Sequence, residues 1–146
     1  TVRDYLEILE NLFVLRNYFN YSLDKRIPVF RKNRKVYFID NFIYRSCKNI
    51  LFGEDVGEEE IPRVVEGIVG EFLWRKFGEV FYFKNRKEVD FLAKDFGIEV
   101  KWQKDVDERD FPKMDLKKKI LLSKDRLELH ENKNLLIIPV PIFLLL

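Results

Sequence analysis

The chain of 146 residues has only one cysteine and one histidine, and these two counts exclude several kinds of site. The single Cys47 excludes an internal disulfide framework and any zinc centre built from several cysteines. The single His130 excludes a histidine-rich metal site. The lack of a disulfide pattern favours a reducing, cytoplasmic setting.

Long apolar runs, an excess of one charge and a nucleotide-binding loop are also missing. No apolar run approaches the roughly 18 residues of a membrane helix, and we expect neither a membrane span nor a signal peptide. Lys and Arg number 27 against 25 Asp and Glu, which leaves a net charge of +2. Any nucleic-acid footprint must therefore be local. Without a Gly-x-x-x-x-Gly-Lys-Ser/Thr motif, we do not expect this chain alone to bind ATP.

The composition is that of a folded and highly charged chain. Hydrophobic residues make up 47% of the sequence, which argues against intrinsic disorder. Charged residues make up 36%, and the single Gln together with many Lys and Glu residues is typical of thermophilic proteins. The length suits one domain, or one domain and a fragment of a second.

Residues 1–53 are predicted to form a partial winged-helix-like segment with a basic hairpin. Thr1 is a suitable N-cap for a helix with apolar residues at helical spacing. The predicted elements are a helix over Val2–Asn17, strands over Phe19–Leu23, Val29–Phe30 and Val36–Ile39, and a helix over Asn41–Phe52 that ends at Gly53.

Residues 54–146 are predicted to form a second domain with the element order αβββαβ. The acidic stretch Glu54–Glu60 is the predicted boundary, and Pro62 sits where a first-turn proline belongs. A helix to Gly78, strands over Val80–Lys84, Glu88–Lys94 and Gly97–Gln103, a basic helix over Phe111–Ser123 and a strand over Asn134–Pro139 should follow. This order predicts an α/β fold in which helices cover the faces of a mixed sheet.

Two carboxylates and a lysine fall on neighbouring predicted strands. Glu99 and Lys101 lie two residues apart, so they should point to the same face of their strand. A short turn joins this strand to the one that carries Asp90, so antiparallel pairing should bring Asp90 beside Glu99. Two such carboxylates suit Mg²⁺, and Lys101 would orient a water or steady developing negative charge. Glu71, on the preceding helix, would add a third carboxylate.

An alternative interpretation is a solvated strand face. In a chain this charged, Glu-x-Lys occurs easily by chance, and antiparallel strands commonly carry charges on the face that meets water. The order of Glu71 on a helix, Asp90 on a strand and Glu99 with Lys101 on the next strand favours the functional interpretation.

Three segments carry a resemblance to a known superfamily. Gly67-Ile68-Val69-Gly70-Glu71, Glu88-Val89-Asp90-Phe91 and Ile98-Glu99-Val100-Lys101-Trp102 resemble the PD-(D/E)XK nucleases. More closely, they resemble the C-terminal domain of a large archaeal and bacterial family of AAA+-type ATPases, in which a nuclease-like domain follows a P-loop module and a winged helix. Val89 stands where many members have proline.

The resemblance implies a restriction-endonuclease-like fold with a metal site. Asp90 and Glu99 would hold Mg²⁺, with Mn²⁺ as a substitute, Lys101 would be the motif lysine, and Glu71 would be the helix carboxylate that supports the metal. The expected partners are DNA and, in the full-length protein, a P-loop ATPase module. Many members of the ATPase-linked family have no established nuclease activity.

A basic cluster without acids precedes these motifs. It consists of Lys25, Arg26, Arg31, Lys32, Arg34 and Lys35, with Tyr21, Phe30 and Tyr37 interleaved. Thr1 to Glu10 looks like the recognition helix of a winged helix, and the basic hairpin would then be the wing that grips phosphates in a salt-dependent way. A solvated turn and a packing surface for an ATPase module are the alternatives.

Three functions therefore stand open at the level of the sequence. The first is a Mg²⁺-dependent, phosphodiesterase-like domain that acts on DNA. The second is a non-catalytic module that docks an ATPase to nucleic acid or to a protein. The third is an interaction domain without a nucleic-acid role.

Overall fold

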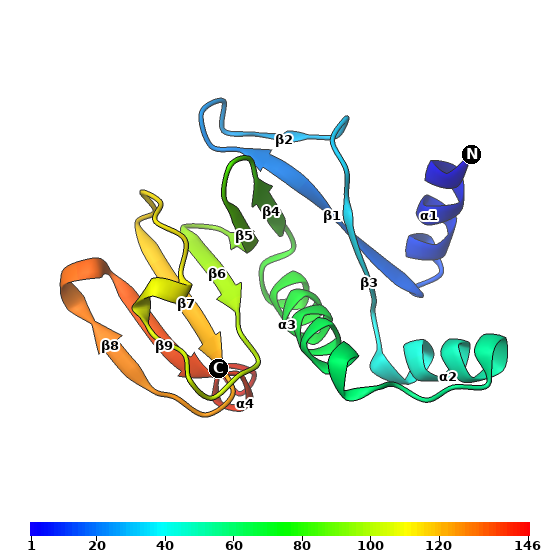
Figure 1. The fold of residues 1–146 in the computed structure, drawn as a ribbon. Coiled ribbons are helices and arrows are strands. Elements are labelled where there is room, and N and C mark those ends of the chain that lie inside the picture. Colours follow the sequence, from blue (N-terminus) through cyan, green and yellow to red (C-terminus); the bar gives the residue numbers. More distant parts are fainter.

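The computed structural model describes all 146 residues as a mixed α/β fold with nine strands and four α-helices (Figure 1). The helices are α1 (Val2–Asn11), α2 (Asn41–Phe52), α3 (Ile61–Phe77) and α4 (Val140–Phe143). The strands are β1 (Leu15–Ser22), β2 (Ile27–Val29), β3 (Lys35–Phe38), β4 (Phe81–Lys84), β5 (Glu88–Ala93), β6 (Phe96–Val100), β7 (Lys118–Ser123), β8 (Glu128–His130) and β9 (Leu135–Pro139). None of the helices combines the length and the apolar character that crossing a bilayer requires.

The nine strands form one mixed sheet. Its order is β2-β1-β4-β5-β6-β7-β9-β8, and β3 pairs with β1 outside this path. The pairs β1–β4, β6–β7 and β7–β9 are parallel, and the other pairs are antiparallel. The sheet therefore runs across the boundary predicted between residues 53 and 54, because Phe19 of β1 pairs with Phe81 of β4.

Several local predictions agree with the structure. Helix α2 has the predicted bounds, with Asp40 as its N-cap and Gly53 in the left-handed region at φ 69°. Helix α3 ends at Gly78, which has φ 75°. Both glycines adopt a conformation that residues with a Cβ rarely take. The three closely spaced strands after α3 also form, as β4, β5 and β6.

The first helix is shorter than predicted. It ends at Asn11, and the chain turns at Phe13, which has φ 57°, before β1 begins at Leu15. The prediction extended the helix to Asn17, but Leu15 to Tyr18 are buried in the sheet. Pairing with β3 therefore outweighs the helical pattern there, since tertiary context overrides a weak local preference.

The predicted basic helix over Phe111–Ser123 is wrong. Residues 118–123 form β7, a central strand paired in parallel with both β6 and β9. Leu121 and Leu122 are fully buried and belong to different hydrophobic clusters, one on each face of the sheet. A strand covered on both faces shows a continuous apolar run and no alternation, and the neighbouring lysines resembled the solvated face of a helix.

Strand β5 contains a β-bulge between Val89 and Leu92. Its partners on β4 are Phe81 for Leu92 and Phe83 for Val89, so one extra residue of β5 lies between these pairs. In an unbroken strand Val89 and Leu92 would face opposite sides, yet both pack in the same cluster, away from α3. Phe91, between them, packs with α3 in the other cluster. The bulge thus reorients β5 around Asp90.

Helix α3 covers this part of the sheet through a glycine contact. The aromatic rings of Tyr18 and Phe91 meet edge to face, with centroids 5.2 Å apart. A Cβ at Gly70 would lie 2.7 Å from the Tyr18 hydroxyl and 2.8 Å from the Phe91 ring. The absence of a side chain at Gly70 therefore sets how closely α3 approaches β5.

Gly70→Ala should destabilise the protein by about 1–3 kcal/mol, because the added methyl overpacks this contact. The effect runs against helix propensity, which favours Ala over Gly by about 1 kcal/mol. Urea unfolding measures the difference, with Arg63→Ala at an exposed position of the same helix as control. An unfolding free energy equal to or above that of the unaltered protein would show that the contact relaxes without cost.

Candidate functional site

The backbone pairing of β5 with β6 ends beside Asp90 and Glu99. The last backbone pair toward the site is Phe91 with Ile98, and the next residues along the two strands are Asp90 and Glu99. Asp90 Oδ2 accepts a hydrogen bond from the Val100 amide at 2.9 Å, and Glu99 Oε2 accepts one from the Asp90 amide at 3.3 Å. Each carboxylate thus binds a backbone amide of the opposite strand, and both side chains are buried.

Lys101, the first residue after β6, forms an ion pair with Glu99. Its ammonium lies 2.9 Å from Glu99 Oε1, with 38% of the side chain exposed. Burial and the negative charge of Asp90 raise the pKa of Glu99 to about 7, against the pull of Lys101. Burial lowers the pKa of Lys101, but its hydrogen bond to Glu99 and the carboxylate charge outweigh this and raise the pKa above its ordinary value. The structure therefore brings Asp90, Glu99 and Lys101 together, and their chemical roles stay predictions.

A second lysine reaches the site from a distant part of the chain. Lys35, at the start of β3, places its ammonium 2.8 Å from Asp90 Oδ1, 2.9 Å from Glu66 Oε1 and 2.9 Å from Glu88 Oε1. Burial lowers the pKa of Lys35, but the charges of Asp90 and Glu66 outweigh it and raise the pKa well above its ordinary value. Burial and the charge of Asp90 raise the pKa of Glu66. Tyr37 donates a short hydrogen bond to the same Glu66 oxygen.

The helical carboxylate beside Asp90 is Glu66, whereas Glu71 was the residue expected there. Glu71 is buried and accepts hydrogen bonds from Arg16, at 3.0 and 3.2 Å, and from Arg75, at 2.9 Å. None of its contacts involves Asp90, Glu99 or Lys101. Five residues along an α-helix correspond to a rotation of about 140°, so the two glutamates point in different directions.

The six predicted nucleic-acid-binding residues divide into two groups. Lys25, Arg26, Arg31 and Lys32 are exposed at the two ends of β2. Arg34 is largely enclosed and stacks on the ring of Phe19, 4.7 Å from its centroid. Lys35 faces the carboxylates. Only the first four side chains are free to meet a phosphate backbone.

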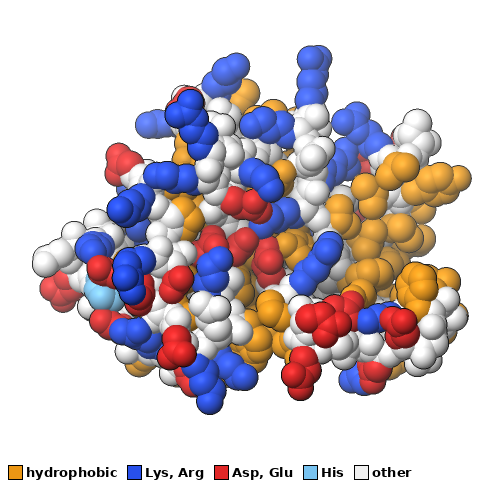
Figure 2. Space-filling model, in the orientation of Figure 1, with side chains coloured by type: hydrophobic (Ala, Val, Ile, Leu, Met, Phe, Trp, Pro, Cys, Tyr) orange, Lys and Arg blue, Asp and Glu red, His pale blue; other side chains and the backbone are white.

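Figure 2 shows how the charges lie on one face of the molecule. Acidic side chains gather near the middle of this face, in the region where Figure 1 places β5 and β6, and Lys and Arg side chains border them. Positive charge therefore borders the acidic side chains on this face, which reduces the repulsion that the acids alone would exert on an anion.

The donor set fits a divalent cation in part. Carboxylate oxygens are the ligands that Mg²⁺ prefers, and burial together with the negative charge of Asp90 raises the pKa of Glu99. No group of three or more His, Cys, Asp or Glu side chains is arranged to hold a metal ion. The structure therefore offers two carboxylates, with Lys35 and Lys101 each bound to one of them.

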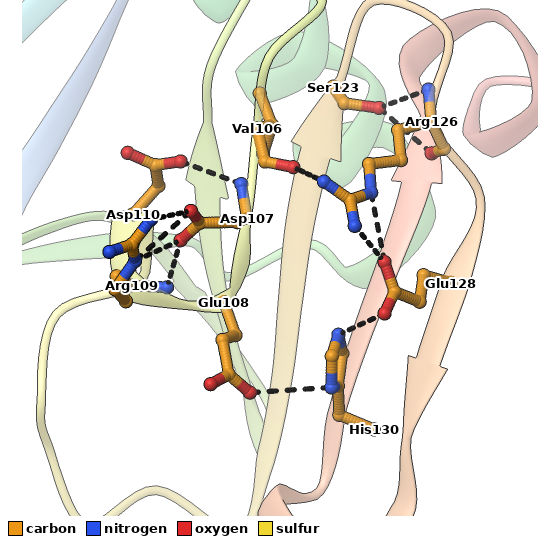
Figure 3. Close-up of polar contacts among 9 residues, drawn as sticks. All are labelled: Val106, Asp107, Glu108, Arg109, Asp110, Ser123, Arg126, Glu128 and His130. Carbon is orange, nitrogen blue, oxygen red and sulfur yellow. Dashed lines mark hydrogen bonds and ion pairs between the residues drawn. The ribbon is translucent and has the colours of Figure 1, made fainter.

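The segment that follows Lys101 is held by polar contacts (Figure 3). His130 Nδ1 lies 3.4 Å from Glu108 Oε2, and its Nε2 lies 3.1 Å from Glu128 Oε1. Arg126 binds Glu128 and the Val106 carbonyl. These contacts join the segment between β6 and β7 to the edge strand β8.

The carboxylate centre consists of Asp90 and Glu99, the lysines Lys35 and Lys101 that contact them, and the two glutamates that also contact Lys35. The sequence prediction missed Lys35, Glu66 and Glu88 in this role. Lys35 was assigned to phosphate binding because it stands in a basic run. Glu66 carried one usable signal, since it lies one helical turn before Gly70, where α3 approaches β5. Glu88 lies two residues before Asp90, and residues at this spacing on a strand point to the same face. The sequence could therefore have placed Glu88 beside Asp90.

The fold and this centre define a mixed α/β protein with buried carboxylates neutralised by two lysines. Comparisons with protein-family models, curated proteins and solved structures find no match for this chain.

Glu99→Gln should become more stable relative to the unaltered protein as pH rises from 5 to 8. The pKa of Glu99 is raised to about 7 from the ordinary value of 4.5, so the folded state binds its proton more tightly than the unfolded state. The unaltered protein consequently loses stability as pH rises through this window, on the order of 2 kcal/mol, and the Gln variant does not.

Urea unfolding at pH 5, 6, 7 and 8 measures this difference. Glu131→Gln is the control, because Glu131 is exposed and forms no ion pair. A difference between Glu99→Gln and the unaltered protein that stays constant with pH would contradict the prediction.

Proposed function

We propose that this chain is a Mg²⁺-dependent, phosphodiesterase-like domain of the PD-(D/E)XK type that acts on DNA. The observation that carries the proposal is the meeting of Asp90, Glu99 and Lys101 where β5 and β6 separate. The Asp90 and Glu99 carboxylates would hold the metal, which supplies charge neutralisation at a phosphate and a more acidic bound water. A restriction-endonuclease-like core and a cytoplasmic setting belong to the same proposal.

Lys101 is suited to work beside the two carboxylates. It is the more exposed of the two lysines, at 38% against 16% for Lys35. An ammonium at this position orients a water by hydrogen bonding or stabilises negative charge that develops on a phosphate. Its contact with Glu99 keeps it within reach of the metal-binding side chains.

DNA is the proposed substrate because of the exposed cations near the start of the chain. Lys25, Arg26, Arg31 and Lys32 lie in the segment that leads into β3, and Lys35 of β3 contacts Asp90. A bound duplex or strand held there by its phosphates would lie next to the carboxylates. A P-loop ATPase module in the full-length protein is the further partner that the resemblance implies.

A metal-binding and cleavage assay tests the enzyme proposal. Supercoiled, single-stranded and branched DNA, each with Mg²⁺ or Mn²⁺, should include a form that the protein cleaves. Asp90→Ala and Lys101→Ala should lower the rate roughly 100-fold or more, because the first removes a metal-binding carboxylate and the second removes the ammonium that acts at the water or the phosphate. Lys104→Ala, an exposed lysine in the next segment, should retain activity.

Direct metal binding provides the second readout of this experiment. The unaltered protein should bind Mn²⁺ by electron paramagnetic resonance, and Glu99→Gln should lose this binding. If the folded protein neither binds Mn²⁺ nor cleaves any form of DNA, the catalytic proposal is wrong.

The alternative function is a non-catalytic module that binds nucleic acid or protein. Its specific support is the number of large apolar side chains exposed on α1, on the turn after it and on α2. These are Val2, Tyr5, Ile8, Leu12, Phe13, Phe42, Ile50, Leu51 and Phe52. Exposed apolar surface of this kind marks interaction sites in many proteins. DNA binding without Mn²⁺ binding favours this alternative, and absence of both favours an interaction domain without a nucleic-acid role.

The double variant Arg31→Glu/Lys32→Glu should weaken DNA binding at low salt and lower the salt dependence of the affinity. Each phosphate contact that is lost lowers the slope of log K against log salt concentration by about 1. Lys118→Glu/Lys119→Glu, on the opposite half of the sheet, is the control with the same change in charge. Fluorescence anisotropy at several salt concentrations measures both, and equal losses would show that the hairpin is not the contact surface.

A further inference from the structure

We propose that Lys35 is an internal counter-ion of the carboxylate centre, and that its ammonium must leave Asp90 before a divalent cation binds there. The inference deepens the proposed function and rests on it. Lys35 is 16% exposed at its side chain, and its ammonium contacts Asp90, Glu66 and Glu88 at 2.8 to 2.9 Å. An ammonium has three N–H donors; that of Lys35 donates hydrogen bonds to Asp90 and Glu66 and forms an ion pair with Glu88.

The two oxygens of Asp90 are held in different ways. Oδ2 is bound by the Val100 amide, which belongs to the backbone of β6. Oδ1 is bound by Lys35, whose four-carbon side chain has rotatable bonds that the β6 backbone lacks. A ligand that enters the centre therefore displaces Lys35 more easily than it displaces the backbone amide.

Electrostatic repulsion makes joint occupancy of Asp90 Oδ1 unfavourable. Mg²⁺ binds carboxylate oxygen at about 2.0–2.1 Å, and the Lys35 nitrogen lies 2.8 Å from the same oxygen. The two cations would then be at most about 5 Å apart in a site with little water, where like charges repel strongly. Occupancy by one cation opposes occupancy by the other.

The remaining contacts give the displaced ammonium a place to stay. Glu88 is more exposed than Asp90, at 36% against 12% of the side chain, and Glu66 is also held by Tyr37. Lys35 can release Asp90 and keep both glutamates, so its charge stays neutralised during the exchange. The metal then binds Asp90, and Lys35 keeps its contacts with Glu66 and Glu88.

Manganese titration of Lys35→Met tests the exchange. Electron paramagnetic resonance at fixed pH and ionic strength measures the Mn²⁺ dissociation constant for the unaltered protein and for each variant. Lys35→Met should bind Mn²⁺ at least tenfold more tightly, because the competing cation is gone. The matched control is Lys84→Met, which removes a lysine 2.9 Å from Glu88 that is 63% exposed and touches neither Asp90 nor Glu66. Its dissociation constant should change less than twofold.

The outcomes separate this inference from the proposed function. Equal Mn²⁺ affinities for Lys35→Met and the unaltered protein, with binding still lost in Glu99→Gln, overturn the inference and leave the proposed function standing. Equal gains in Lys35→Met and Lys84→Met also overturn it, because they indicate a general charge effect. If no folded variant binds Mn²⁺, the proposed function fails and the inference fails with it.

A measurement on the unaltered protein keeps the test valid if Lys35→Met does not fold. Nuclear magnetic resonance of the lysine ε-methylene groups, titrated with Mg²⁺, follows each side chain directly. The Lys35 signal should shift in proportion to bound Mg²⁺, and the Lys84 signal should shift less. A Lys35 signal that stays constant while Mg²⁺ binds would overturn the inference.

Discussion

Backbone amides at the point where β5 and β6 stop pairing need acceptors, and this need organises the centre of the molecule. A buried N–H without a partner is costly, so the strands can separate there only if other groups accept. The Asp90 carboxylate takes the Val100 amide, and the Glu99 carboxylate takes the Asp90 amide. The same two hydrogen bonds thereby stabilise the separation and hold two acidic side chains in fixed positions.

Buried carboxylates create a second constraint, which the lysines satisfy. Removing a charge from water is expensive unless an opposite charge and hydrogen bonds compensate. Lys101, which directly follows β6, neutralises Glu99 two residues earlier, and Lys35 neutralises Asp90 from β3, 55 residues earlier in the chain. The charge balance of the centre therefore depends on β3, which joins the sheet through β1. This dependence makes the first part of the chain a structural component of the site.

The prediction succeeded where local rules were sufficient. A short turn between two apolar strands specifies a hairpin, and the hairpin brings Asp90 next to Glu99. Local rules failed for residues 111–123, because a strand buried on both faces lacks alternation and the adjacent lysines imitated a helical pattern. They also failed at Glu71, since its place on the predicted helix did not reveal that Arg16 would bind it.

The sequence by itself determined the α/β class, the ends of the two longest helices and the absence of sites built on several cysteines or histidines. These properties depend on composition and on neighbours within a few residues. Only the tertiary structure decided that a bulge reorients β5 around Asp90, that Glu66 faces this centre and that Lys35 is enclosed among carboxylates. Each of these results depends on contacts between distant segments, whose geometry becomes defined only when the sheet is complete.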